Sequence, residues 1–301
     1  MRADALTRAD YREARLVRRL VEGVHGAAPA GAVFLAPGTL AGLRLMFASL
    51  GVRRVVLSDD EYFDRSAFPA GRVEVVRFES LAAHVVRRRP HAVLVSVVTW
   101  RGRRNAIEEC FREIRARLGG DSPLLVADAS HAGAAGFPRV TALGADIVLG
   151  DVGKWITPPA WSDQLGFLWL RAGKLRAVAR RVFAPYYLAG VRPGCRLEAR
   201  WVDPGVVARI VAWQRDNRVT RRKLLARHKI DMALAALVAA RCGLPSPSSA
   251  LVWMESAAAI RRIPKWAGET GQLWRPQGGG ARVMCRSDAP PTARRGRGRR
   301  S

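Results

Sequence analysis

The chain has 301 residues, of which 49% are hydrophobic, so it can bury a sizeable core and is not a disordered protein. Its 51 Lys and Arg against 25 Asp and Glu give a formal net charge of +26, which raises the question of nucleic-acid binding. The arginines are spread along the whole chain rather than gathered into one face or arm, which argues against nucleic-acid binding as the main function.

The N-terminal stretch, Met-Arg-Ala-Asp-Ala-Leu-Thr-Arg, lacks the apolar segment of a signal peptide. No apolar run reaches the roughly 18 residues that span a bilayer, so we expect a cytoplasmic protein without a membrane anchor. Apolar residues recur at helical spacing from residue 10 to 24, which predicts a helix. Residues 1–30 are therefore interpreted as an N-terminal helical segment.

Short apolar strands alternate with helical patterns from residue 31 to 175. Strands are predicted at 32–35, 55–57, 73–76, 92–98, 124–127, 147–149 and 165–170, and helices at 40–50, 80–88 and 104–118. This alternation favours an α/β fold with a mostly parallel sheet covered by helices on both faces. We interpret 31–175 as a large domain.

The pattern changes after about residue 175. Residues 205–242 are nearly all helix formers, with core positions predicted at Val206, Ile210, Trp213, Val219, Leu224, Ile230 and Leu234. A strand at 250–254 and a glycine-rich segment at 278–285 follow, so 176–285 is interpreted as a helical connection and a small C-terminal domain. Residues 286–301 include a basic tail at 293–301, which we expect to be disordered and to bind polyanions only non-specifically. The four cysteines have no metal or redox spacing, so no metal site is predicted.

Lys154 stands out because it follows the apolar run Ile147–Leu149 in a chain that uses arginine almost everywhere. The sequence contains only five lysines, at positions 154, 174, 223, 229 and 265. A partly desolvated lysine can lose its proton and attack a carbonyl, whereas arginine stays protonated. The alternative interpretation is a lysine whose stem crosses apolar surface while its amine reaches water.

Two further groups follow predicted strands. Gly38-Thr39 lies between a strand and a helix, where backbone N–H groups and the helix dipole can hold a phosphate; the alternative is a simple N-cap by Thr39. Tyr62 and Phe63 follow the strand at 55–57, where an aromatic ring can cover a flat ligand; the alternative is ordinary core packing. Ligands of open parallel sheets bind at the carboxyl ends of strands, so these positions are candidates for a site.

Asp128 directly follows the strand at 124–127, and His131 comes three residues later. In isolation, Asp128 can be an N-cap and His131 a loop histidine. Together with Lys154 and a phosphate turn, they match what pyridoxal 5′-phosphate needs. The lysine would form a Schiff base, and the carboxylate would keep the ring nitrogen protonated.

These motifs resemble the class V aminotransferase family of fold type I pyridoxal-phosphate enzymes. This family includes cysteine desulfurases, isopenicillin epimerase-like proteins and kynureninases. The likeness covers roughly residues 10–175 and rests mainly on Asp128-Ala-Ser-His-Ala-Gly and on Gly144-Ala-Asp-Ile-Val-Leu-Gly-Asp-Val-Gly-Lys-Trp. It implies a fold type I large domain with a reduced small domain, and a homodimer with active sites at the subunit interface.

The resemblance also implies roles for individual residues. Lys154 is the Schiff-base lysine, Asp128 the partner of the ring nitrogen, and His131 the contact to the ring hydroxyl. The Gly38–Thr39 turn resembles the phosphate-binding turn of the family. Tyr62 occupies the position where the family often stacks a histidine or another aromatic ring on the cofactor.

Several positions depart from the family pattern. Gly153 replaces the histidine that usually precedes the lysine, and Asp151 replaces a phosphate-contacting Ser or Asn. Arg282, and secondly Arg200, are candidates for binding the carboxylate of a substrate, with an ordinary surface position as the alternative for both. No loop resembles the cysteine motif of the desulfurases, which argues against sulfur transfer.

The sequence therefore predicts a pyridoxal-phosphate enzyme that acts on an amino acid or amine. Transamination, epimerisation and elimination share this apparatus, so the reaction type stays open. Two alternatives remain: a homologue that binds the cofactor without turnover, and a basic protein that binds nucleic acid or another polyanion.

Overall fold

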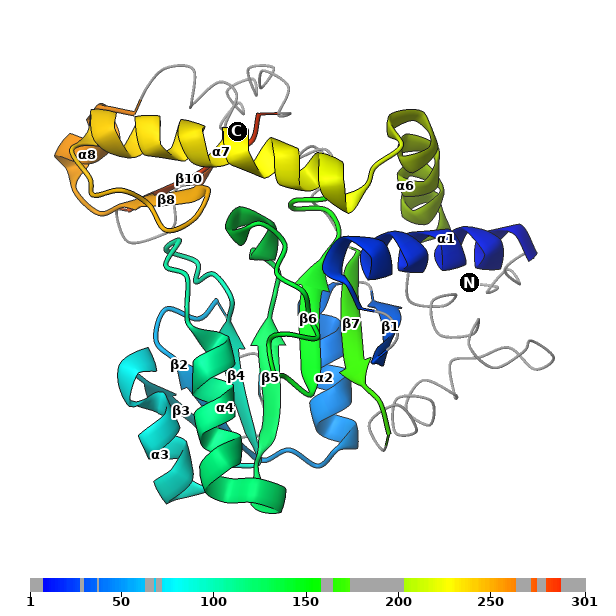
Figure 1. The fold of residues 1–301 in the computed structure, drawn as a ribbon, viewed down its shortest axis with the longest axis vertical. Helices are drawn as coiled ribbons and strands as arrows, with labels where there is room; N and C mark the ends of the chain where they lie inside the picture. Colours follow the sequence, from blue (N-terminus) through cyan, green and yellow to red (C-terminus); the bar gives the residue numbers. More distant parts are fainter. Residues whose placement is uncertain are drawn as a thin grey trace, which may run out of the picture.

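The computed structural model describes residues 8–27, 30–36, 38–62, 68, 72–157, 165–173, 203–263, 272–274 and 280–287 (Figure 1). Phe63, Arg200 and the basic tail at 293–301 lie outside the described residues. The other predicted site residues lie within them.

A seven-stranded sheet forms the centre of the fold, in the order β1-β7-β6-β5-β4-β2-β3. Strands β2 to β6 pair in parallel, whereas β7 runs antiparallel to both of its neighbours, β6 and β1. The strands are Gly31–Ala36 (β1), Arg54–Ser58 (β2), Arg72–Val76 (β3), Ala92–Ser96 (β4), Leu124–Asp128 (β5), Ile147–Asp151 (β6) and Gly166–Arg171 (β7). The predicted mostly parallel α/β sheet is confirmed.

Helices cover both faces of this sheet, which explains why its strands are apolar runs rather than alternating ones. On β4, Val93 and Val95 face a core with α1 (Arg8–His25), α3 (Leu81–Arg88) and α4 (Ile107–Leu118). Ala92 and Leu94 face a second core with α2 (Thr39–Ser49). All four side chains are fully buried. Burying an aliphatic side chain contributes about 1.5–3 kcal/mol, so both layers stabilise the sheet.

Strand β4 ends two residues earlier than predicted, and α4 begins three residues later than predicted. The segment between them folds back on itself, since Asn105 N donates to Val97 O and Val98 bridges Arg104. Val97 and Val98 are buried, although they lie outside the strand. Their burial, rather than strand pairing, accounts for the apolar run.

A smaller α/β unit follows. Helices α6 (Pro204–Asn217) and α7 (Arg221–Cys242) are capped by Asp203 and Thr220 side chains, so the predicted helical stretch is broken at residues 218–220. The apolar face of α7 packs with α8 (Ala257–Arg261) on a three-stranded antiparallel sheet. This sheet has the order β8-β10-β9, formed by Leu251–Met254 (β8), Gln272–Trp274 (β9) and Ala281–Met284 (β10).

One predicted core position on α7 is wrong. Ile230 is 55% exposed, because the helix turns its neighbour Asp231, only 1% exposed, to the interior. Figure 1 shows α7 (yellow) running across the end of the large sheet where β5 and β6 finish. In the described part of the chain, no helix combines the length and apolar character needed to cross a membrane.

Candidate functional site

Lys154 lies in the turn that follows β6. The Asp151 carboxylate accepts a hydrogen bond from the backbone N–H of Lys154 at 2.8 Å and lies 4.0 Å from its Nζ. Burial raises the pKa of Asp151, while the charge of Lys154 and this N–H act in the opposite direction. Asp151 therefore shapes the turn and pairs electrostatically with the lysine, which is 28% exposed.

Asp128 is the last residue of β5, and its side chain sits in the interior at 4% exposure. Its carboxylate accepts a hydrogen bond from Ser130 N at 2.8 Å, which closes a tight turn after the strand. Burial raises the pKa of Asp128, and hydrogen bonding to Ser130 and the charge of Lys154 act in the opposite direction. The carboxyl thus lies close enough to Lys154 to feel its charge.

His131 is a neutral imidazole held in one tautomer. Burial, then the charges of Lys154 and Arg282, keeps its pKa well below the ordinary value. The indole N–H of Trp155 donates to His131 Nδ1 at 3.3 Å. Because an indole can only donate, Nδ1 is the acceptor and the ring proton lies on Nε2. Nε2 can therefore donate a hydrogen bond to an oxygen of a ligand.

The Gly38–Thr39 turn presents the N-terminus of α2 to the same region. Gly38 is the N-cap residue, its φ of 146° is in the region that favours glycine, and no side chain caps the helix. Thr39 is thus the first helical residue rather than the cap. Its Oγ1 lies 3.4 Å from Ser130 Oγ and 3.4 Å from the carbonyl oxygen of Gly150. The uncapped N–H groups and the helix dipole suit an anion.

Gly166, which the sequence analysis did not single out, allows this turn to lie against β7. An ideal Cβ on Gly166 would be 2.6 Å from Thr39 N and 2.7 Å from Gly38 C. Any larger residue would push the turn away from the strand.

Tyr62 lies over the lysine, with its ring centroid 5.8 Å from Lys154 Nζ. The tyrosine is 61% exposed, so it is not a core residue. This arrangement leaves the aromatic face near the amine.

Arg282 on β10 reaches the site from the smaller sheet. It is 8% exposed, so the alternative of an ordinary surface position is wrong for this residue. Its guanidinium donates to the carbonyl oxygen of Trp100 at 3.4 Å. Burial lowers the pKa of Arg282 to about 10, and Tyr62 acts in the opposite direction. Arg282 is thus electrostatically coupled to both Tyr62 and His131.

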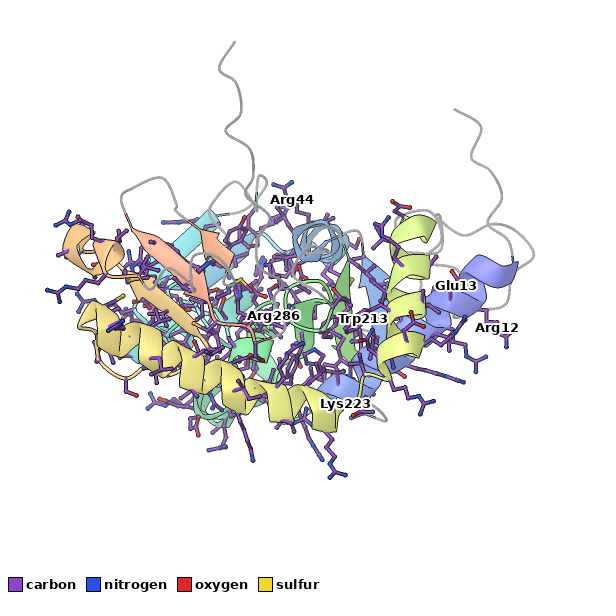
Figure 2. All side chains as sticks on the ribbon, turned by 90° about the horizontal axis from the view of Figure 1, so that it is seen from above. Arg12, Glu13, Arg44, Trp213, Lys223 and Arg286 are labelled. Atoms are coloured by element: carbon purple, nitrogen blue, oxygen red, sulfur yellow. The ribbon has the colours of Figure 1, made fainter. Side chains whose placement is uncertain are left out.

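Two further arginines hold the backbone of the lysine turn. Arg286 donates to the carbonyl oxygen of Lys154, and Arg227 on α7 donates to that of Trp155. Asp231 pairs with Arg227 and accepts hydrogen bonds from the N–H and hydroxyl of Ser287. Figure 2 shows Arg286 toward the middle of the molecule, whereas Arg12 and Lys223 lie at its edge.

A second carboxyl, Glu61, lies close enough to Asp128 to be affected by its charge. It accepts hydrogen bonds from the Ser58 hydroxyl and from both the backbone N–H, at 2.7 Å, and the hydroxyl of Ser96. Ser96 ends β4 and is the register partner of Asp128 on β5. A polar residue at the end of a buried strand was the signal that identified Asp128, and it applies equally to Ser96.

The structure therefore brings Lys154, Asp128, His131, the Gly38–Thr39 turn and Tyr62 to one end of the large sheet, with Arg282 and Asp151 beside them. Arg200 lies outside the described residues. Within the described part of the chain, no cluster of His, Cys, Asp and Glu could hold a metal ion.

Comparison with protein-family models and with curated proteins finds no match for the sequence. Solved structures that superpose on the chain include aminotransferases and lyases. The chain superposes on a subgroup IV aspartate aminotransferase from Thermus thermophilus with a TM-score of 0.59 and 16% identity, covering 92% of this chain and 85% of that one. For the methionine gamma lyase CalE6 from Micromonospora echinospora, the TM-score is 0.60 and the identity 17%, over 91% and 82% of the chains.

An alanine–glyoxylate aminotransferase from Nostoc sp. gives a TM-score of 0.61 at 14% identity, covering 94% of this chain and 84% of that one. These similarities confirm the predicted fold type I architecture of the chain.

Proposed function

We propose that this protein is a pyridoxal-phosphate-dependent enzyme that acts on an amino acid or amine. One observation carries the proposal: a lysine, a buried carboxylate and an uncapped helix N-terminus are linked at adjoining strand ends. Thr39 contacts both Ser130, which bonds Asp128, and the carbonyl of Gly150, in the strand that leads to Lys154. The fold shared with aminotransferases and lyases supports it.

The residues present fit the cofactor. The amine of Lys154 would attach its aldehyde, the carboxylate of Asp128 would pair with its ring nitrogen, and Nε2 of His131 would donate to its ring hydroxyl. The N–H groups at Gly38 and Thr39 would hold its phosphate, and the ring of Tyr62 would cover it. The Asp151 carboxylate accepts a hydrogen bond from the backbone N–H of Lys154, so it need not face the phosphate.

Bound pyridoxal phosphate supplies an electron sink for negative charge that develops at the substrate Cα. Lys154 Nζ would remove and return the proton at that carbon. Asp128 would hold the proton on the ring nitrogen, since a buried anion stabilises a nearby positive charge. Arg282 would orient a substrate carboxylate through its planar guanidinium. Aminotransferase, epimerase and lyase reactions all fit this division of roles.

The test is a cofactor titration of the purified full chain, followed by visible absorbance. Wild type should acquire an absorbance band on addition of pyridoxal phosphate, and sodium borohydride should fix the cofactor covalently to the peptide containing Lys154. Lys154→Ala should lose both, while Lys223→Ala, a lysine in the exposed first turn of α7, should retain both. A wild-type protein that remains colourless would refute the proposal.

Exchange of the substrate Cα proton in deuterated water separates an enzyme from a homologue that only binds the cofactor. Wild type should exchange the α-proton of at least one amino acid, and Lys154→Ala of none. The family resemblance further suggests a homodimer, which sedimentation at several protein concentrations would test.

A further inference from the structure

A cavity of about 680 Å³ lies between α1, α6 and the start of α7, away from the residues assigned to the cofactor. Figure 1 shows α6 (olive) beside α1 (blue), with α7 beginning next to them, and α1 contacts both of these helices. The volume falls within the roughly 300–1,000 Å³ that is typical of small-molecule sites. The cavity is therefore large enough to hold a ligand of its own.

Part of the lining is apolar. Leu16, Leu20 and Val24 come from one face of α1, at helical spacing, and Val211 on α6 and Val219 after it complete this surface. Leu16 is 40% exposed, whereas the other four are buried. An apolar group that covered Leu16 would remove this surface from water, which is favourable. The cavity thus has a wall that suits an apolar part of a ligand.

The rest of the lining is strongly basic. Four of the twelve lining residues are arginines, at positions 19, 215, 218 and 221, and none is Asp or Glu. This share is about twice that of Lys and Arg in the whole chain, where they make up 51 of 301 residues. Among the described residues, none of the four forms an ion pair with an Asp or Glu. Their like charges repel one another, and a bound anion would offset that repulsion.

The four arginines divide into two kinds. Arg221 belongs to the structure, because its Nη1 donates to the carbonyl oxygens of Val24 and Phe137, both at 2.6 Å. The other three are exposed. A guanidinium presents its N–H groups as a planar fork that matches the oxygens of a phosphate. Three such groups around one cavity therefore favour a phosphate over an uncharged ligand.

Gly23 faces the same cavity from within α1. Glycine inside a helix is destabilising relative to alanine, so it needs a reason. Gly42 in α2 has one, since a Cβ there would lie 2.5 Å from Leu168 Cδ1. A Cβ on Gly23 would meet nothing within 4 Å, so packing between the described residues does not require glycine. Close approach of a ligand to the helix backbone does require it.

We propose that this cavity is a binding site for an organic phosphate, in which a phosphate dianion is joined to an apolar group. Arg19, Arg215 and Arg218 bind the phosphate, and the apolar group passes Gly23 to cover Leu16. The inference goes beyond the proposed function and is independent of it, because no candidate cofactor residue lines the cavity.

The first test is calorimetric titration of the full chain with naphthyl phosphate, inorganic phosphate and naphthol. Naphthyl phosphate should bind at least tenfold more tightly than either of the other two, which supply only the charge or only the apolar group. The double variant Arg215→Gln/Arg218→Gln should bind it at least tenfold more weakly than wild type. Arg209→Gln, an exposed arginine of α6 outside the cavity, is the control. Equal affinity in the double variant and the control would overturn the proposal.

The second test fills the cavity without changing its charge. Gly23→Leu should be at least as resistant to urea as wild type, because leucine is the better helix former and a Cβ has room at this position. Its affinity for naphthyl phosphate should nevertheless fall at least tenfold. A folded Gly23→Leu protein that binds naphthyl phosphate as tightly as wild type would refute the site.

The third test separates this cavity from the proposed cofactor site, where the Gly38–Thr39 turn could also take a phosphate. Gly166→Ala, which disturbs that turn, should bind naphthyl phosphate as wild type does. Binding that is lost in Gly166→Ala but kept in the arginine double variant would overturn the inference and leave the proposed function standing. A protein that never binds pyridoxal phosphate, yet loses naphthyl phosphate only in the cavity variants, would do the reverse.

The source of the phosphate is resolved by sedimentation with phosphatidylcholine vesicles that contain phosphatidic acid. Sedimentation of wild type but not of the arginine double variant would identify a lipid headgroup as the phosphate. Sedimentation that is absent, or equal in both proteins, alongside tight binding of naphthyl phosphate would identify a soluble organic phosphate.

Discussion

The guanidinium of Arg286 donates a hydrogen bond to the backbone carbonyl of Lys154 at 2.5 Å, joining residues 132 positions apart. Arg227 holds the next carbonyl, that of Trp155, from the side of α7. The turn carrying the lysine is thus fixed from outside by the smaller sheet and its helix. We call these two arginines, Arg286 and Arg227, the arginine clamp. A substitution in the clamp should displace Lys154 without removing a residue that contacts a ligand.

Replacing Arg286 tests this clamp. Arg286→Lys keeps the charge but loses the planar fork, so the part-buried hydrogen bond to the carbonyl of Lys154 is lost. We expect the free energy of unfolding to fall by about 1–3 kcal/mol and the affinity for pyridoxal phosphate to fall with it. Urea denaturation and cofactor titration measure the two effects. Arg222→Lys, on the exposed side of α7, is the matched control, and an unchanged cofactor affinity in Arg286→Lys would contradict the expectation.

Asp231 braces the clamp, since it accepts from Ser287 N at 2.7 Å and lies 3.6 Å from Arg227 Nε. Asp231→Asn removes the buried negative charge that pairs with Arg227, whose side chain is 13% exposed. We expect a loss of about 3 kcal/mol in unfolding free energy. A double-mutant cycle with Arg227→Gln, followed by urea denaturation, should give a coupling energy above about 0.5 kcal/mol. Strict additivity would mean that the two residues do not act together.

Gly166→Ala tests the phosphate-binding role proposed for the Gly38–Thr39 turn. The added methyl would meet Thr39 N and displace the start of α2 from β7. We expect the affinity for pyridoxal phosphate to fall at least tenfold, about 1.4 kcal/mol, while the weaker affinity for pyridoxal, which has no phosphate, stays the same. Gly120→Ala, where a Cβ meets nothing within 4 Å, is the control. Equal losses for both ligands would place the damage elsewhere in the site.

The lowered pKa of His25 predicts that the folded protein loses stability in acid. Burial, and then the charge of Arg221, lowers the pKa of His25 to about 3, while in the unfolded chain it is 6.5. Below pH 6.5 the unfolded chain therefore binds a proton that the folded chain does not. Stability should fall by up to about 1.4 kcal/mol for each pH unit between 6.5 and 3.

In His25→Leu this contribution should disappear, so its stability relative to wild type should rise as the pH falls below 6.5. Urea denaturation at several pH values measures the difference. If the unfolding free energies of wild type and His25→Leu fell equally with pH, another group would be responsible for the loss of stability in acid.

The strands of the large sheet could be predicted because helices cover both faces, so the central strands are continuous apolar runs. The run Val93–Val95 is apolar on both faces, and Gly38, Asp128 and Lys154 each follow a strand at a recognisable distance. Ile230 could not be placed, because a long helix with arginines on several sides has no single apolar stripe. Asp231, its buried neighbour, would have been assigned to the surface by the same logic.

The supporting residues of the site were beyond sequence reasoning for a different reason. Glu61 follows Asp59 and Asp60, so its neighbours suggest a solvated acidic turn. Arg286 is one of many arginines, and its hydrogen bond to the lysine turn depends on how β10 is placed. Of these three residues, only Ser96 could have been identified from the sequence, because it is a polar residue at the end of a buried strand.

The separation of Lys154 from Arg286 also sets an order of events during synthesis. A ribosome adds about 5–20 residues per second, so the 132 positions between them take roughly 7–26 s. During that interval the strands of the large sheet have all emerged, but the lysine turn lacks its arginine. A nascent or truncated chain ending before β10 would therefore contain every strand of the large sheet but lack the hydrogen bond from Arg286 to the carbonyl of Lys154.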